Sequence, residues 1–169
     1  MSLSKDERQK NANLALSLLL AATGNNRIST SFHRRDDSAF KNVHNTTWVE
    51  LEEQRLINSL LNHTALGYSL TANGWIKAVR DAGLIRDQDF LKKLGSLSRV
   101  IKGHVKGRHA EVMINLQTVA SEAGLAENWI YNVIESNMLE VVFAKRGATW
   151  LSNFKGQIIK IPITFGLDV

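Results

Sequence analysis

Apolar residues recur at helical spacing near the start of the chain, in a stretch that ends at Gly24. The repeating positions are Leu14, Leu18 and Ala21 or Ala22. Ser4 precedes this stretch as a candidate N-cap, because its hydroxyl oxygen can accept from a free backbone N–H of the first turn. The pattern therefore predicts a helix over residues 4–22 whose apolar side packs on another element.

The region from 25 to 45 is polar, and its weaker patterns favour a short strand at 28–33 and a short helix at 38–43. Helical spacing then returns behind a cap at Asn45 or Thr46. The apolar positions of this second helix are Trp48, Leu51 and Leu56 or Ile57. Acidic residues lie near its start, where they suit the positive end of a helix.

Two candidate strands follow, LINSLL at 56–61 and GYSLT at 67–71, with a turn region between them. Thr71 can cap a helix that runs through TANGWIKAVRDAG and ends at Gly83. The predicted order is helix, strand, turn, strand, helix.

This segment resembles a winged helix-turn-helix domain over residues 46–82. In that superfamily an apolar pair, here Leu56 and Ile57, leads from a helix into a two-stranded wing. The phrase YSLTANGW is similar to the junction between wing and helix. Arg55 departs from the pattern, because a glycine often stands at its position.

The second half of the chain begins with a predicted helix over 87–106. Its apolar positions step by four, three and four residues: Phe90, Leu94, Leu97 and Ile101. Such a stripe packs on a neighbouring helix of the same chain or on a second copy of the molecule, and packing within the chain is favoured. A further short helix is expected at 109–115.

Residues 116–135, LQTVASEAGLAENWIYNVIE, match the helix-turn-helix pattern. Ala120 is small enough for two helices to cross closely, and Gly124 can take the left-handed conformation that ends the first helix. The positions that would anchor the second helix on the core are Leu125, Ile130 and Val133.

Downstream, residues 138–162 predict two strands around a turn that contains glycine, which again resembles a wing. The expected fold class is therefore mainly α with small antiparallel β wings, as a tandem winged helix-turn-helix. The expected domains are a winged-helix-like domain at 1–85, a basic connector helix at 86–108, and a helix-turn-helix with a C-terminal wing at 109–169.

The composition, with 44% hydrophobic and 22% charged residues, indicates a packed core rather than disorder. Cysteine is absent, which excludes disulfides, thiolate metal sites and cysteine nucleophiles and fits a cytoplasmic location. The most apolar run, residues 13–24, is about half as long as a membrane span. We therefore expect neither a transmembrane helix nor a signal peptide.

No motif for catalysis or cofactor binding is recognisable. The stretches GNNR and KRG lack the spacing of a phosphate-binding loop, and no serine lies in a GxSxG context. The five histidines have none of the usual metal-site spacings: His33, His44, His63, His104 and His109. The expectation is a protein without enzymatic activity, cofactor or bound metal.

In helix-turn-helix proteins the second helix enters the major groove of DNA. Its outward positions here would be Glu127, Asn128, Tyr131, Asn132 and Glu135. Asparagine can pair with adenine and tyrosine can donate to phosphate, so Asn128, Tyr131 and Asn132 are candidate contacts. The two glutamates oppose phosphate binding, and residues 116–135 contain no lysine or arginine to offset them.

The net charge of +5 is concentrated in residues 86–108, which hold seven basic and two acidic residues. The seven basic residues are Arg86, Lys92, Lys93, Arg99, Lys102, Lys106 and Arg108. Lys92, Arg99 and Lys106 are seven residues apart, so they share one side of a helix. Further positive charge comes from Lys145 and Arg146 at the start of the second predicted wing.

These features predict a DNA-binding protein with a role in transcription regulation or as an accessory factor. Phosphates would be held by the connector helix and the second wing: Lys92, Lys93, Arg99, Lys102, Lys106, Arg108, Lys145 and Arg146. The alternative is a protein-protein interaction scaffold, which the acidic outward faces would allow. A homodimer is also expected, because such readers often pair to cover two half-sites.

Overall fold

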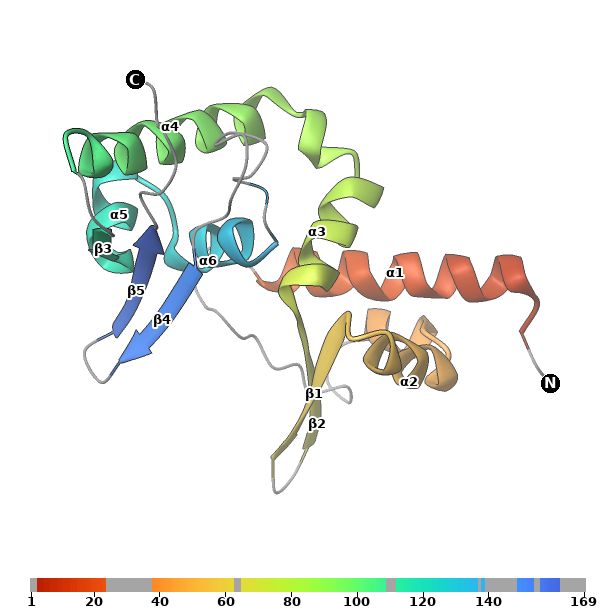
Figure 1. Ribbon diagram of the computed structural model, residues 1–169. Helices are drawn as coiled ribbons and strands as arrows, with labels where there is room; N and C mark the ends of the chain where they lie inside the picture. Colours follow the sequence, from red (N-terminus) through yellow and green to blue (C-terminus); the bar gives the residue numbers. More distant parts are fainter. Residues whose placement is uncertain are drawn as a thin grey trace. The chain divides into compact units, whose positions relative to one another are not determined.

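The computed structural model divides the chain into two compact units, Met1–Leu84 and Ile85–Val169. The residues that the structure describes are 3–23, 38–62, 65–108, 112–136, 138, 149–153 and 156–161. Helices predominate among them, with two small antiparallel sheets (Figure 1). The expected fold class, mainly α with small antiparallel β elements, is confirmed.

The first unit follows the predicted order of elements. These are α1 (Lys5–Thr23), the 3-10 helix η1 (Ser38–Asn42), α2 (Asn45–Glu53), β1 (Ile57–Asn62), β2 (Ala65–Leu70) and α3 (Ala72–Asp81). The strands β1 and β2 form an antiparallel hairpin in which Ile57 pairs with Leu70. The strand expected at 28–33 lies outside the described residues.

Two predicted helix caps are present in the first unit. Ser4 and Glu7 form a reciprocal capping box, in which Glu7 N donates to Ser4 Oγ at 3.3 Å and Ser4 N donates to the Glu7 carboxylate at 2.8 Å. Thr71 caps α3, where its hydroxyl oxygen accepts from Gly74 N at 3.0 Å. Helix α2 differs, because it is capped by His44 rather than by Asn45 or Thr46.

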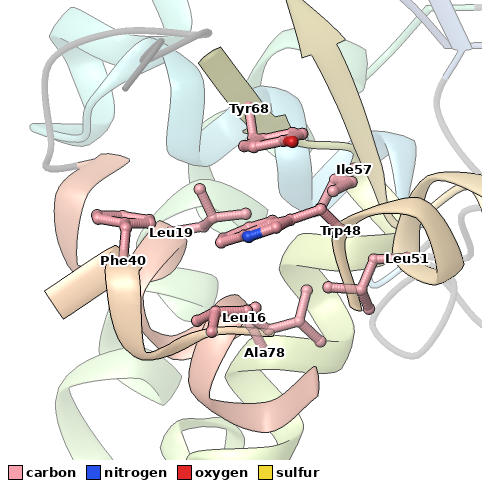
Figure 2. Close-up of a cluster of buried hydrophobic side chains, with 10 residues drawn as sticks. Leu16, Leu19, Phe40, Trp48, Leu51, Ile57, Tyr68 and Ala78 are labelled. Atoms are coloured by element: carbon pink, nitrogen blue, oxygen red, sulfur yellow. The ribbon is translucent and has the colours of Figure 1, made fainter. Parts of the chain in front are cut away.

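The core of the first unit is built around three stacked aromatic rings (Figure 2). The Trp48 ring lies 4.4 Å from that of Tyr68 and 5.9 Å from that of Phe40, measured between centroids. Aliphatic side chains from the surrounding elements complete this cluster: Ala15, Leu16, Leu19, Val43, Leu51, Ile57 and Ala78. The cluster joins α1, η1, α2, the hairpin and α3 into one hydrophobic core.

The apolar face expected for α1 is wrong except at Leu18, which is partly buried against the core. Leu14 is 38% exposed, and Ala21 and Ala22 are exposed, whereas Leu16 and Leu19 are buried. The segment from 14 to 22 is apolar at almost every position, so its spacing fits more than one helix face. The packing of α1 on α2, β2 and α3 selects the buried one.

The end of α2 also differs from the prediction. The helix stops at Glu53, and Arg55 has a φ of 56°, the left-handed conformation in which glycine is favoured. This turn brings Leu56 to α3, where the Leu56 carbonyl accepts from Thr71 N at 3.0 Å. Gly74 packs so closely here that a Cβ would overlap the same carbonyl.

The second unit contains the basic helix and the helix-turn-helix. After η2 (Leu84–Arg86), its elements are α4 (Gln88–Val105), β3 (Val112–Asn115), α5 (Leu116–Ala123), α6 (Glu127–Glu135), β4 (Thr149–Asn153) and β5 (Gly156–Ile161). The sheet has the order β3-β5-β4, with both pairings antiparallel. The first strand of the unit is therefore paired with the last.

The short helix expected at 109–115 is wrong, because residues 112–115 form β3. Its alternation agrees with a strand, since Ile114 is buried while Met113 is 59% exposed. Ile114 pairs with Ile159, a residue 45 positions later in the chain. The sequence around residues 112–115 therefore carries little signal for a strand, because the strand is only four residues long and its partner lies far along the chain.

Candidate nucleic-acid interface

The helix-turn-helix predicted at 116–135 is present as α5, a turn and α6. Gly124 ends α5 in the left-handed conformation, with a φ of 66°, and Leu125 N donates to the Ala120 carbonyl at 3.0 Å. Ala120 is 8% exposed, while Ile130 and Val133 are completely buried. Ala120, Ile130 and Val133 are therefore buried as expected, whereas Leu125, the third expected anchor, is only half-buried.

The outward face of α6 is smaller than expected. Asn128 is only 7% exposed, and its side-chain oxygen accepts from Trp129 N at 2.9 Å. Its expected place on the reading face is therefore wrong. Tyr131 and Asn132 are half-buried, and the exposed members of the expected set are Glu127 and Glu135, of which Glu135 is partly covered by its surroundings.

Burial shifts the pKa values of two side chains on this face, Tyr131 and Glu135. Burial raises the pKa of Tyr131 above its ordinary value of 10.0, and the nearby Glu135 charge raises it further. Burial also raises the pKa of Glu135 above 4.5. At neutral pH the Tyr131 hydroxyl thus keeps its proton and can act as a hydrogen-bond donor.

The basic residues of α4 lie on the solvent side of the helix. Lys92 and Arg99 each stand two residues from a buried side chain, Phe90 and Leu97, and two residues correspond to about half a turn. We call Lys92, Arg99 and Lys106 the basic stripe; all three are exposed. Other exposed basic residues of the segment are Arg86, Lys93, Lys102 and Arg108.

Acidic residues neutralise the basic stripe only weakly within the described chain. Lys92 lies 3.6 Å from Asp89, with side chains that are 75% and 83% exposed. Ion pairs this exposed contribute little, because water and salt screen them. The stripe therefore presents positive charge to solvent.

Three contacts attach α4 to the helix-turn-helix. Ser96 Oγ donates to the Ala123 carbonyl at 3.1 Å, and His104 Nε2 lies 2.6 Å from the Glu122 carboxylate, so α5 is held at two points. The Phe90 ring meets the Trp129 ring of α6 edge-on, with centroids 5.5 Å apart. The inner side of α4 also packs on β3.

These contacts determine which way the side chains of the basic stripe point. The side of α4 that carries Phe90 faces α6, and Lys92 lies about half a turn away from it. The stripe thus points away from α6 and does not extend its outward face. The apolar stripe of α4 packs within the chain, as the sequence favoured.

Two of the three glutamates of α2, Glu50 and Glu52, have partners inside the first unit. Glu50 lies 3.7 Å from the Arg8 guanidinium of α1. Glu52 accepts from both Ser59 N, at 3.1 Å, and Ser59 Oγ, at 2.5 Å, which connects α2 to β1. Local sequence spacing does not reveal these partners, because they belong to other elements, α1 and β1.

Several expected contacts are not described by the structure. Lys145 and Arg146, at the start of the second predicted wing, lie outside the described residues.

In the part of the chain that is described, no group of three or more His, Asp or Glu side chains could hold a metal ion. The described helices also include none that is long and apolar enough to cross a membrane.

Comparisons with protein families, with curated proteins and with solved structures found no match for this chain. The arrangement of helices and small antiparallel sheets is compatible with a winged-helix-like fold.

Proposed function

We propose that this chain is a tandem winged-helix protein that binds double-stranded DNA in a regulatory or accessory role. The element order supports the winged-helix assignment: the second unit has a helix, a strand, a helix-turn-helix and a hairpin, and its first strand pairs with its last. The first unit likewise passes from a helix into a hairpin and then into α3.

The observation that carries the DNA proposal is the basic stripe. It is exposed, it lies on a helix anchored to the helix-turn-helix, and neighbouring acids compensate it only weakly. Lysine and arginine side chains gain affinity for DNA by displacing condensed counterions from phosphates, without reading bases. Lys93, Lys102 and Arg108 would add to this attraction, as would Lys145 and Arg146.

Base reading has a smaller part in the proposal. With Asn128 buried, the groups of α6 that remain are Tyr131 and Asn132, both half-buried. The Tyr131 hydroxyl can donate to a phosphate, and Asn132 can pair with a base edge. We therefore expect modest sequence preference beside a strong dependence on salt.

Fluorescence anisotropy with a random-sequence duplex tests the proposal. The chain should bind at about 50 mM salt and lose affinity steeply as salt rises, because counterion release drives the association. Replacing Lys92, Arg99 and Lys106 by alanine should reduce the slope of log K against log salt by about 2.7, at about 0.9 per lost phosphate contact.

A matched variant removes the same charge elsewhere. Lys5, Lys10 and Arg80 are exposed in the first unit, and their replacement by alanine should leave most of the affinity intact. If the wild-type chain does not bind duplex at about 50 mM salt, where electrostatic association is strongest, the DNA proposal is wrong.

The outward charge of α6 favours a second candidate, a protein-protein interaction scaffold. Glu127 and Glu135 are exposed beside the half-buried Tyr131, and such a face suits a basic partner better than a phosphate backbone. Replacing both glutamates by glutamine separates the two functions. A phosphate-binding face should gain duplex affinity from this change, whereas a scaffold should lose its partner.

A further inference from the structure

We propose that the exposed side of α4 forms a self-contained site for the sugar-phosphate backbone of duplex DNA, with two glycines that allow the backbone to approach the helix closely. This inference rests on the proposed DNA binding. It goes further by assigning the site to one helix face, separate from α6, and by giving Gly95 and Gly103 a role in binding.

Small and basic residues alternate along this side of α4. The residues in order are Lys92, Gly95, Arg99, Gly103 and Lys106, at steps of three, four, four and three, with Lys106 as the C-cap that follows the last residue of α4. Such steps keep side chains on one side of a helix. Successive basic residues are thus about 10 Å apart along the axis, and the face is about 20 Å long.

Neither glycine is required by the fold of the described chain. Gly95 and Gly103 have no positive φ, so an alanine could adopt the same conformation. A Cβ built at either position meets nothing within 4 Å. Glycine is a poor residue for the interior of a helix, because it loses more backbone entropy than alanine on folding.

Their effect is to leave the helix backbone uncovered between the basic side chains. A backbone of phosphates and sugars is bulky, and it can come closest to a helix where no side chain projects from the helix surface. A methyl group at Gly95 or Gly103 would hold it away from Arg99, which stands between them. The open positions thus bring phosphate within reach of short, direct contacts.

Duplex is favoured over single-stranded nucleic acid by the composition of this face. Single-strand sites stack bases on exposed aromatic rings. Phe90 is the only Phe, Tyr or Trp in α4, and it is buried against Trp129. A length of about 20 Å spans about six nucleotides along one DNA strand. This is enough for three basic residues to contact separate phosphates.

The experiment compares Gly95→Ala/Gly103→Ala with the wild-type chain in folding and in binding. Alanine should raise Tm by about 5 to 10 °C, because it favours the helix at two exposed positions. The same variant should weaken binding to a random duplex by about threefold to tenfold, since fewer close phosphate contacts form. A purely structural role cannot produce this pair of opposite effects.

Gln117→Ala is the control, because Gln117 is exposed on α5 and lies outside the α4 face. It should leave duplex affinity unchanged. A single-stranded competitor of the same length, added at the same total phosphate concentration, should displace the duplex poorly.

The outcomes separate this inference from the proposed function. Absence of duplex binding by the wild-type chain overturns both. If the chain binds and loses affinity when the basic stripe is replaced, but the glycine variant binds normally, DNA binding stands and the close-approach site is overturned. Equal displacement by single strands would overturn the duplex assignment.

Discussion

Helices α2 and α4 each carry a run of like charge, but the two runs have different surroundings. Two of the three glutamates of α2 face partners in their own unit, Arg8 for Glu50 and Ser59 for Glu52. The basic stripe of α4 faces solvent, with only a weak contact between Lys92 and Asp89. A charge run therefore indicates function only when the structure shows what lies opposite it.

The glycines of the two units show a similar contrast between an internal contact and a surface open to solvent. Gly74 of the first unit touches the backbone of Leu56, so that no side chain fits. Gly95 and Gly103 of the second unit border open space. The first unit uses its small residue to close an internal contact, whereas α4 has small residues on a surface that an external molecule can reach.

Gly74→Ala should have the largest effect on stability. Its Cβ would lie 1.8 Å from the Leu56 carbonyl oxygen, so α3 would have to shift away from the turn after α2. We expect a loss of about 3 kcal/mol in the free energy of unfolding, the upper end of the usual cost of overpacking. Denaturant unfolding of the whole chain measures it.

Gly95→Ala is the matched control for that change, and it should stabilise the chain instead. Equal stability of the two variants would break the contrast between closed and open glycines.

Two of the left-handed residues, one in each unit, allow a comparison of intermediate size. Gly124 has a φ of 66° and Arg55 a φ of 56°. Gly124→Ala should cost about 1 kcal/mol, because a Cβ is disfavoured in this conformation. Arg55→Gly should change stability by less than about 1 kcal/mol, in the stabilising direction, because relief of strain is offset by a more flexible unfolded chain.

Thermal unfolding followed by circular dichroism measures both variants. A stabilised Gly124→Ala would show that the turn of the helix-turn-helix does not depend on the left-handed conformation.

The smallest expected effects concern the pH dependence of stability, where one glutamate in each unit has a shifted pKa and the two shifts have opposite signs. Hydrogen bonds from Ser4 lower the pKa of Glu7 below 4.5, so its stabilisation is present above pH 4.5 and is lost as pH falls through the lowered pKa. Burial raises the pKa of Glu135, so stability decreases as pH rises from 4.5 through the raised pKa.

Carboxyl chemical shifts followed by NMR report both pKa values directly. Glu7→Gln should flatten the acid side of the stability curve, and Glu135→Gln should flatten the side above pH 4.5. Shifts of the same sign in the two groups would contradict the assignment of causes.

Local sequence signals were sufficient for much of the fold. Ser4, Thr71 and Gly124 identify helix ends because their chemistry acts within one turn of the chain. The two strands of the first hairpin and the helix-turn-helix were recognisable for the same reason. The predictions failed where contacts with a distant part of the chain determine the structure. The strand β3 is defined by its pairing with β5, and the buried face of α1 is determined by its packing on α2, β2 and α3.

The candidate site was predicted only in part. The sequence identified the basic residues and the absence of positive charge on α6. It placed Asn128 outward, because helical spacing alone does not show how much of α6 the rest of the unit covers.

The sequence by itself determined the helix caps, the helix-turn-helix and the position of the basic residues along the chain, since these depend on neighbours a few residues apart. Only the tertiary structure decided that Glu50 and Glu52 of α2 have internal partners, that Asn128 is buried, and that the basic stripe points away from α6. The physical reason is that burial, pairing and direction depend on which surfaces meet in space, and those surfaces come from distant parts of the chain.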